Sequence, residues 1–218
     1  MKDYSQVSIP VIKRLPRYHR YLEELKNMGV VRISSKELSS RMGLTASQIR
    51  QDLNCFGGFG QQGYGYNIEQ LYNEIGNILG INQRSKAIMI GAGNLGHAIA
   101  THLRFENRGF DLIGIFDNNP NVIGTTIGNK TVISSDELEE FCQKEKPVVA
   151  ILCIPAEYAA ENADKLVSLG IRGFWNFTQY DLVHRYEGVA VENVHLGDSL
   201  MTLCYQINSL PENMGDNS

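Results

Sequence analysis

The sequence predicts an α/β protein made of two domains in series, and three observations lead to this prediction. Two short helices with a glycine turn between them lie near the N-terminus, a glycine-rich loop follows an apolar strand at residues 91–96, and strands then alternate with helices. The charge is also divided. Residues 1–56 carry ten Lys and Arg against five Asp and Glu, and the remainder carries ten against nineteen. A basic segment on an acidic body indicates that one end meets a polyanion, although chance segregation would give the same balance.

The composition is that of a globular protein. Hydrophobic residues make up 43% and charged residues 20% of the 218 residues, and no apolar run approaches the roughly 18 residues needed to span a membrane. The N-terminus lacks the apolar block of a signal peptide, so we expect a cytoplasmic protein. The four cysteines show neither metal nor redox spacing, and we expect reduced thiols and no metal site. They are Cys55, Cys142, Cys153 and Cys204.

A helix-turn-helix is predicted from about Arg17 to Phe56. A helix starts at Pro10, is restarted or kinked by Pro16, ends before Gly29 and has apolar positions at helical spacing, namely Val11, Leu15, Tyr18, Leu22 and Leu25. The segments 34–37 and 45–48 both match capping boxes, and Gly43 lies between the two short helices that they start.

The second short helix has one apolar and one polar face. Its residues Ile49, Leu53 and Phe56 recur at core spacing. The opposite face presents Ser47, Arg50, Gln51 and Asn54. Amide side chains can make paired contacts to adenine, and arginine can do so to guanine, so this face predicts DNA reading rather than a plain solvated surface.

Residues 57–66 predict a wing. Five of these ten residues are glycines, aromatic residues lie among them, and no acidic residue occurs. Such a hairpin can lie along DNA, and we expect Gly60 and Tyr64 to contact it. A phosphate-binding loop is the alternative, but no Lys-Ser/Thr follows and no strand precedes. A helix over 68–79 closes the domain at Gly80, so the DNA-binding domain covers 1–80 and a linker 81–85.

A nucleotide-binding domain is predicted for residues 86–195. The strand 86–90 leads into a GxGxxG loop, and a helix over 97–105 follows. The first glycine allows a tight turn, the second allows close approach of a pyrophosphate and the third lets helix and strand pack, while the helix N-terminus favours the anion. The loop residues are Gly91, Ala92, Gly93, Asn94, Leu95 and Gly96.

Asp117 ends the second strand of this domain, residues 112–116, about twenty residues past the loop. A carboxylate there binds the adenosine ribose hydroxyls and repels a 2′-phosphate, so NAD is preferred over NADP. A plain turn aspartate before Asn118 is the alternative, and the preceding loop favours the nucleotide.

The alternation of strands and helices continues to the C-terminus and predicts a doubly wound, mainly parallel sheet of the Rossmann type. We expect helices over 134–144 and 155–169, and strands over 148–154, 173–177 and 189–191. Loops after the strands face the ligand crevice, and they contain Cys153, Ile154, Pro155, Asn176, Phe177 and Thr178.

Catalytic residues are not evident. Little chain remains for a substrate domain, no Tyr is followed four residues later by Lys, and the five histidines form no dyad. We therefore expect a DNA-binding protein controlled by NAD rather than an enzyme. A small NAD-dependent oxidoreductase with a basic accessory domain is the alternative, and a nucleotide-free scaffold is a third possibility that the intact loop and Asp117 argue against.

The chain resembles the Rex family of redox-sensing transcriptional repressors over nearly its whole length. The matching segments are Lys13–Pro16, Gln48–Leu53, Phe56–Gly57, Gly63–Tyr66, Gly91–Gly96 and Asn176–Thr178. The resemblance implies a homodimer with winged-helix domains, which holds an inverted-repeat operator when NADH is scarce and releases it when NADH binds, so that NADH and NAD+ are regulatory ligands. It also implies that a last helix, within 196–210 and before a tail at 211–218, is exchanged between subunits.

The resemblance also implies which residues contact the ligands. It places Arg14, Arg17 and Arg20 on the DNA side, together with the polar face of the second short helix. Family members carry Tyr at the position of His102 and Asp at that of His195, and some carry Phe at Leu196, near the nicotinamide or the contact between domains. A histidine at 195 predicts an NADH response that changes between pH 6 and 8.

Overall fold

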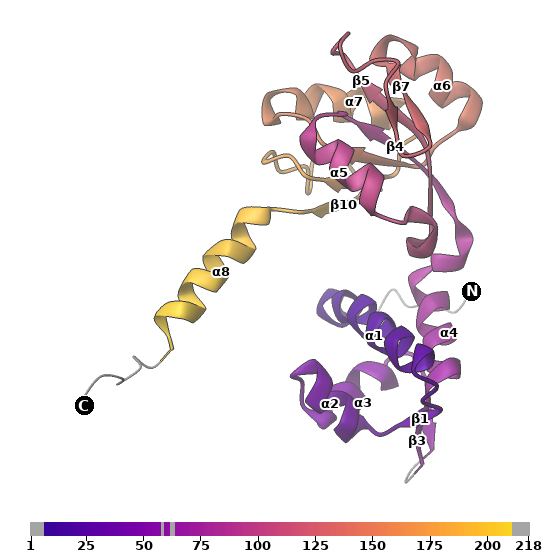
Figure 1. Ribbon diagram of the computed structural model, residues 1–218, viewed down its shortest axis with the longest axis vertical. Coiled ribbons are helices and arrows are strands. Elements are labelled where there is room, and N and C mark those ends of the chain that lie inside the picture. The colour runs from indigo at the N-terminus through magenta and orange to yellow at the C-terminus, as the bar shows by residue number, and fades with distance from the viewer. Residues whose placement is uncertain (1–6, 58, 62–63, 211–218) are drawn as a thin grey trace. The chain divides into compact units, whose positions relative to one another are not determined.

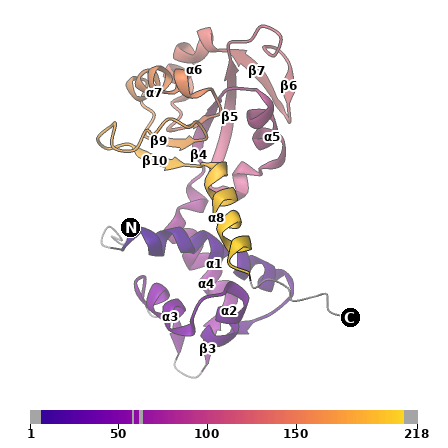
Figure 2. The ribbon, with the colours of Figure 1, turned by 90° about the vertical axis from the view of Figure 1, so that its left-hand side faces the viewer.

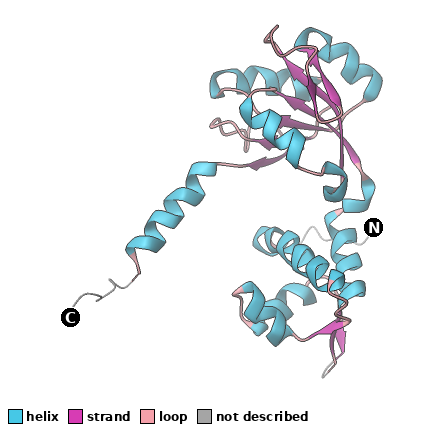
Figure 3. Cartoon of the chain, in the orientation of Figure 1, coloured by secondary structure: helices cyan, strands magenta, loops and turns pink. Residues whose placement is uncertain are grey.

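The computed structural model describes residues 7–57, 59–61 and 64–210, and the chain divides into two compact units, Met1–Gln83 and Arg84–Ser218. Figure 1 labels most of the helices and strands, and Figure 3 colours them by type. The α-helices are α1 (Ile9–Asn27), α2 (Ser35–Met42), α3 (Ala46–Asn54), α4 (Ile68–Leu79), α5 (Asn94–His102), α6 (Leu138–Glu145), α7 (Ala159–Ser168) and α8 (Leu196–Asn208). The strands are β1 (Arg32–Ile33), β2 (Gly60–Gln61), β3 (Gly65–Asn67), β4 (Ser85–Ile90), β5 (Phe110–Asp117), β6 (Thr126–Ile127), β7 (Lys130–Ser134), β8 (Val149–Leu152), β9 (Gly173–Asn176) and β10 (Ala190–Asn193).

The first unit is a winged helix-turn-helix. Helix α1 packs on α4, and α2 packs on α3. All five apolar positions predicted for α1 are buried, as are the three predicted for α3. Ser34 and Glu37 form the expected capping box at α2, and Gly43 ends that helix in the left-handed conformation. The predicted pattern of buried and exposed faces is therefore confirmed in this unit.

Two local predictions in the first unit were incomplete. Of the two alternatives at Pro16, a restart and a kink, the structure excludes the restart, because helix α1 runs through this residue. Thr45 caps α3 by accepting a hydrogen bond from the backbone N–H of Gln48, but the second half of the predicted capping box is replaced. The Gln48 side chain donates instead to Asp52, at 2.8 Å, because that buried carboxylate offers an acceptor one turn along the helix.

The wing is a short antiparallel hairpin. Strand β3 pairs with β2 on one side and with β1 on the other, giving the order β1-β3-β2. Gly65 has a φ of +70°, and a Cβ there would lie 2.6 Å from the carbonyl oxygen of Ile33. Glycine is therefore required where the wing returns to β1. The predicted wing residues 58, 62 and 63 lie outside the described residues, as do the proposed tail at 211–218 and residues 1–6.

The second unit contains, among the described residues, a seven-stranded sheet in the order β10-β9-β8-β4-β5-β7-β6. All neighbouring strands are parallel except β6 and β7. The chain starts at the central strand β4, moves to β5 on one side and later to β8 on the other. The Rossmann architecture is confirmed, and its switch point lies between β4 and β8.

Helices cover both faces of this sheet, as Figures 1 and 2 show. One face packs Ile88 and Ile90 against α6 and α7, through side chains that include Leu138 and Leu166. The other face packs Met89 with the α5 side of the unit. The alternation along β4 follows the period of two expected of a strand that is buried on both sides.

Several boundaries in this unit differ from prediction. Strands β6 and β7 were not predicted, because each has few apolar residues and glycines surround them. Helix α5 begins at Asn94, inside the glycine motif, and ends at His102, since residues 105–108 form a 3₁₀ turn instead. The predicted linker contains another 3₁₀ turn, Ile81–Gln83, and the first residue of β4.

Helix α8 contributes no buried residue to its own chain. Its apolar residues are between 48% and 68% exposed at Leu196, Leu200, Met201, Leu203 and Ile207. Exposed apolar side chains at this helical spacing are typical of an interface. Within the described part of the chain, no helix is long and apolar enough to cross a membrane.

Candidate nucleotide site and nucleic-acid interface

The glycine loop has the geometry of an anion cradle at the switch point. Gly91 has a φ of +98°, and a Cβ there would lie 2.4 Å from the carbonyl oxygen of Cys153 on the neighbouring strand connection. A Cβ at Gly96 would lie 2.1 Å from the carbonyl oxygen of Gly91, so only glycine lets α5 pack this closely. A Cβ at Gly93 would meet nothing within 4 Å, which leaves open the side from which a ligand can approach.

The N-terminus of α5 lies directly behind this loop. Gly93 is its N-cap and provides no side-chain cap. The first N–H groups of a helix have no partner within the helix, and the helix dipole favours a negative charge near them. Residues 91–96 therefore fit a pyrophosphate, as the spacing of the glycines predicts.

Asp117 is joined to the glycine loop. Its Oδ2 accepts a hydrogen bond from the Ala92 N–H at 2.6 Å, and its Oδ1 accepts one from the Asn119 N–H at 2.8 Å. These bonds fix the carboxylate at the end of β5, beside the loop, and each oxygen keeps a further lone pair for a ribose hydroxyl. The turn role and the nucleotide role considered from the sequence are thus compatible.

The side chains at the ends of β8 and β9 form two groups. The first group is apolar or uncharged, and the second, Asn176 and Thr178, is polar. Cys153 and Ile154 lie against Gly91, Pro155 is exposed, and Phe177 contacts Trp175 edge-on at 4.5 Å between ring centroids. Burial raises the pKa of the Cys153 thiol to about 12, so this side chain is neutral at physiological pH. The two residues that lie against Gly91, Cys153 and Ile154, are therefore uncharged.

Asn176 and Thr178 hold the fold together instead of pointing at open space. Asn176 is 0% exposed, and its Nδ2 donates to the Tyr180 carbonyl at 2.7 Å and to Asn193 Oδ1 at 2.8 Å. The Thr178 hydroxyl donates to Asn176 Oδ1 at 2.8 Å. Their predicted contact with the cofactor stays a prediction, and the structure assigns these side chains to the link between β9 and β10.

The two histidines at positions where family members carry other residues, His102 and His195, lie at helix ends. His102 is the last residue of α5 and is exposed. His195 precedes α8 as its N-cap, and its Nδ1 lies 3.7 Å from Asp198 Oδ2. The pH dependence expected from His195 stays a prediction.

The outer face of α3 forms a hollow of about 500 Å³. The four polar residues predicted to read DNA are all exposed there, and the hollow is lined by Ser47, Arg50, Gln51, Asn54 and Cys55. Arg50 also donates to the Ser35 hydroxyl of α2 at 3.0 Å. Helix α3 thus presents a continuous set of amide, hydroxyl and guanidinium groups, which is the chemistry that reads base edges.

The three arginines of α1 have contacts within the unit. Arg14 forms a two-point ion pair with Asp52, and Arg17 donates to the Met42 carbonyl oxygen. The Arg20 guanidinium carbon lies 5.8 Å from the centroid of the Tyr21 ring. On the wing, the Tyr64 side chain is 70% exposed. Contacts of these residues and of Gly60 with DNA stay predictions, and for Arg14 the structure shows an internal role first.

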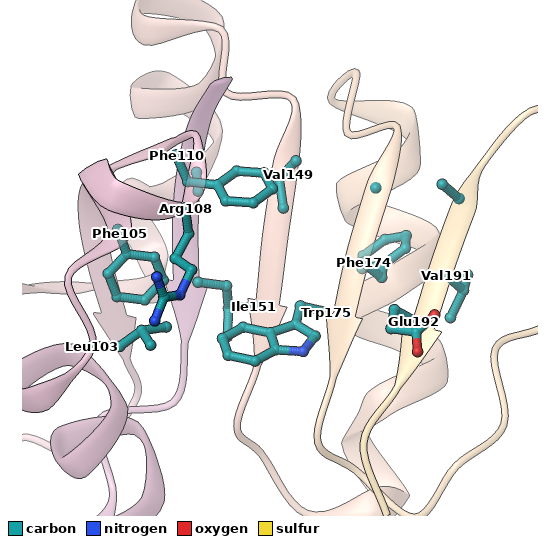
Figure 4. Close-up of a pocket in the computed structure, with 13 residues that line it drawn as sticks. Leu103, Phe105, Arg108, Phe110, Val149, Ile151, Phe174, Trp175, Val191 and Glu192 are labelled. Carbon is teal, nitrogen blue, oxygen red and sulfur yellow. The ribbon is translucent and has the colours of Figure 1, made fainter. Parts of the chain in front are cut away.

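A second hollow, which the sequence did not predict, lies on the face of the sheet. It has a volume of about 560 Å³, and Figure 4 shows the residues that line it. Strands β8 and β9 supply Ile151 and Trp175, and the chain around the 3₁₀ turn after α5 supplies Phe105 and Arg108. Alternate apolar residues on adjacent strands were the available signal, but the lining comes from the five strands β4, β5, β8, β9 and β10, so it can be recognised only when the strand order is known.

These features define the class of protein: a winged helix-turn-helix unit joined to a Rossmann unit with an anion cradle. A family model described as "Putative DNA-binding protein N-terminus" matches residues 6–54, and one described as "CoA binding domain" matches residues 82–180. A redox-sensing transcriptional repressor Rex from Caldanaerobacter subterraneus subsp. tengcongensis is 56% identical over 95% of this chain and 92% of its own length. The Rex of Clostridium beijerinckii is 51% identical over 95% of this chain and 98% of its own.

Solved structures agree with these relatives. The crystal structure of RSP, a Rex-family repressor, matches with a TM-score of 0.84 and 53% identity, over 93% of this chain and 94% of that one. RSP in complex with beta-NAD+ and operator DNA matches with a TM-score of 0.86 and 55% identity, over 93% of both chains. The chain belongs to the Rex family of redox-sensing transcriptional repressors. Because the relatives are named as repressors and not as enzymes, this finding supports the repressor over the oxidoreductase.

Proposed function

We propose that this chain represses transcription by holding an inverted-repeat operator through α3 and the wing, and that NADH in the Rossmann unit releases it. The observation that carries the proposal is that one chain combines an exposed DNA-reading face on α3 with a glycine cradle that fits a nucleotide. RSP has been crystallised with beta-NAD+ and operator DNA, and with beta-NADH. The proposal extends those ligands to this chain and places the protein in the cytoplasm.

The residues around the cradle support a preference for the reduced ligand. NAD+ carries a positive charge on its nicotinamide ring and NADH does not. Neutral groups at the ends of β8 and β9 stabilise a cation poorly, because moving an unpaired charge out of water costs free energy. Cys153 belongs to this neutral set, since burial keeps its thiol protonated. When bound, the nucleotide supplies no reaction here; its redox state is the signal.

A second copy of the chain is part of the proposal. Helix α8 exposes an apolar surface that its own chain leaves uncovered. Exchange of α8 between two copies buries that surface, and the two-fold symmetry of such a dimer matches an inverted repeat. Complete switching requires about 5.5 kcal/mol of differential binding, which two nucleotide sites supply jointly.

The test is a titration of the protein on an inverted-repeat duplex, followed by fluorescence anisotropy. We expect NADH to release the DNA, NAD+ to do so only weakly, and coenzyme A not to do so. Asp117→Asn should need at least ~10-fold more NADH, because one ribose contact to a charged acceptor is lost. Asp111→Asn, at the opposite end of β5, is the matched control. Release by coenzyme A, or no release by NADH, would contradict the proposal.

A separate variant tests the DNA-reading face. Gln51→Ala should lose about 1–3 kcal/mol of binding free energy on the operator and less on a scrambled duplex. Gln70→Ala, an exposed glutamine on α4, is the control. Equal losses on both duplexes would show that Gln51 reads no base.

A further inference from the structure

The DNA-reading helix contains a buried charge. Asp52 lies on α3 and is 0% exposed, although its neighbours Gln51 and Asn54 are exposed on the outer face. It shares the inner face with Ile49 and Leu53, which are also buried. A carboxylate is rarely buried in this way unless it is paired, so its partners are the next question.

Four donors surround this carboxylate. Arg14 of α1 donates from Nε to Oδ2 at 2.6 Å and from Nη2 to Oδ1 at 2.7 Å. The Tyr18 hydroxyl, also from α1, donates to Oδ2 at 2.9 Å, and Gln48 Nε2 donates to Oδ1 at 2.8 Å. Burial alone would raise the pKa of Asp52, but these hydrogen bonds from Arg14, Gln48 and Tyr18 outweigh burial and lower it. The group is therefore an anion held in a fixed orientation.

Stability alone does not account for this arrangement. A buried ion pair of this kind is often replaced by apolar residues with no loss of stability, because the desolvation of both charges offsets their attraction. What the ion pair adds is direction. Apolar contacts at Ile49 and Leu53 tolerate sliding and small rotations, whereas two parallel hydrogen bonds from a planar guanidinium set one orientation.

A small rotation of α3 matters at its outer face. Side chains there lie roughly 5–6 Å from the helix axis, so a 10° rotation displaces them by about 1 Å. Hydrogen bonds to base edges vary in length by only about 0.5 Å. The groups of Arg50, Gln51 and Asn54 would lose paired contacts to bases after such a rotation, whereas contacts to phosphates made through long, flexible side chains would adapt.

We propose that Asp52 is the positioning residue of the DNA-reading helix: bound to Arg14 and Tyr18 of α1, it fixes the rotation of α3, so sequence specificity depends on a residue that touches no DNA. This inference rests on the proposed function, since it concerns the same reading face. It also changes the role of Arg14, which was expected to contact DNA: its first role is to hold Asp52 and so to fix the orientation of the reading face.

The test compares the affinity for the operator with that for a scrambled duplex of the same length, at several salt concentrations and at a temperature where circular dichroism shows each variant folded. Asp52→Asn keeps the shape and removes the charge. We expect its operator affinity to fall at least ~10-fold and its affinity for scrambled DNA to fall less than ~2-fold, with an unchanged salt slope, because the number of phosphate contacts is unchanged. The matched control is Asp164→Asn, at an exposed Asp–Arg pair in the other unit, and should behave as the parent protein.

A second variant separates positioning from stability and serves also if Asp52→Asn does not fold. The pair Asp52→Leu with Arg14→Met replaces the ion pair by apolar side chains and should restore the unfolding temperature, but not the preference for the operator. Equal losses on both duplexes for Asp52→Asn, or a restored preference in the apolar pair, would overturn the inference. A parent protein that does not distinguish the two duplexes would overturn the proposed function itself, which is a different result.

Discussion

Among the residues that the structure describes, an aspartate, an arginine and a tyrosine meet once in each unit. In the helix-turn-helix unit the carboxylate of Asp52 is 0% exposed and its arginine is 27% exposed, whereas in the Rossmann unit Asp164 is 53% and Arg185 36% exposed. The hydrogen bonds are of the same kind, since Arg185 Nη2 donates to Asp164 Oδ2 at 2.8 Å and a neighbouring tyrosine hydroxyl also donates to this carboxylate.

This difference shows that exposure to solvent, and not the choice of residues, determines how much such a cluster contributes to the stability of the fold. Around Asp164, water competes for every donor and salt screens the charges, so the cluster only restrains the loop that contains Arg185. Around Asp52, no water replaces a lost partner, so each donor becomes necessary. The following predictions test this contrast, from the largest expected effect to the smallest.

Removing each carboxylate should separate the two clusters most clearly. Asp52→Ala should lower the free energy of unfolding of the first unit by about 3–5 kcal/mol, because Arg14 is left beside a buried, unpaired site. Asp164→Ala should leave the free energy of unfolding of the Rossmann unit almost unchanged. Urea unfolding followed by circular dichroism reports both units, and the fluorescence of Trp175, the chain's one tryptophan, reports the Rossmann unit. Similar losses in the two variants would refute the contrast.

Acid should unfold the first unit through Asp52. Hydrogen bonds keep the folded pKa of this carboxyl below its usual range, against the effect of burial. The ionised form therefore stabilises the fold above the unfolded pKa of about 3.9, and this stabilisation is lost as the pH falls through the folded pKa. We expect constant stability from pH 5 to 8 and a decline below about pH 4. Asp52→Asn should show a weaker decline, and an identical decline would assign the acid sensitivity to other groups.

Exchanging the two arginines for lysine should have an intermediate effect. Lysine cannot form two parallel bonds to one carboxylate. Arg14→Lys should therefore cost about 2 kcal/mol of unfolding free energy, the value of one hydrogen bond to a charged group. Arg185→Lys should have a much smaller effect, since water substitutes for the missing donor. Chemical unfolding of both variants under the same conditions gives the comparison, and equal costs would show that burial is not the deciding factor.

Added salt should produce the smallest of these effects, and it should act on the exposed ion pair of the Rossmann unit. At 1 M salt the screening length is about 3 Å, which removes much of the attraction between exposed charges. The coupling between Asp164 and Arg185, measured by a double-mutant cycle, should approach zero as salt rises from 50 mM to 1 M. The coupling between Arg14 and Asp52 should change little. A salt-sensitive coupling in the buried pair would indicate that water reaches it.

The same contrast explains what could be predicted from the sequence. Periodicity identified the buried face of α1 and α3, since apolar residues at helical spacing determine which face packs. The same periodicity places Asp52 at the core spacing between Ile49 and Phe56, which indicates a buried carboxylate. Its partner Arg14 lies 38 residues away, and only the folded unit brings the two together.

The nucleotide site follows the same rule. Glycine spacing predicted the loop, because the requirement for a missing side chain is local to the chain. The buried roles of Asn176 and Thr178 were not predicted, because they depend on Asn193 and Tyr180, which belong to a neighbouring strand and a loop. Strand β7 was not predicted either, since a five-residue strand with two apolar residues is defined mainly by its neighbour β5.

The exposure of helix α8 links the helical content of the protein to its concentration. It has 13 residues, and none of them is buried by its own chain. A helix of that length is only marginally stable in water by itself. In the proposed dimer its folding is linked to association, and by mass action the helical content of the protein should rise with protein concentration. On that proposal, a cell that makes more of this chain would also shift a larger fraction of its copies into the folded dimer.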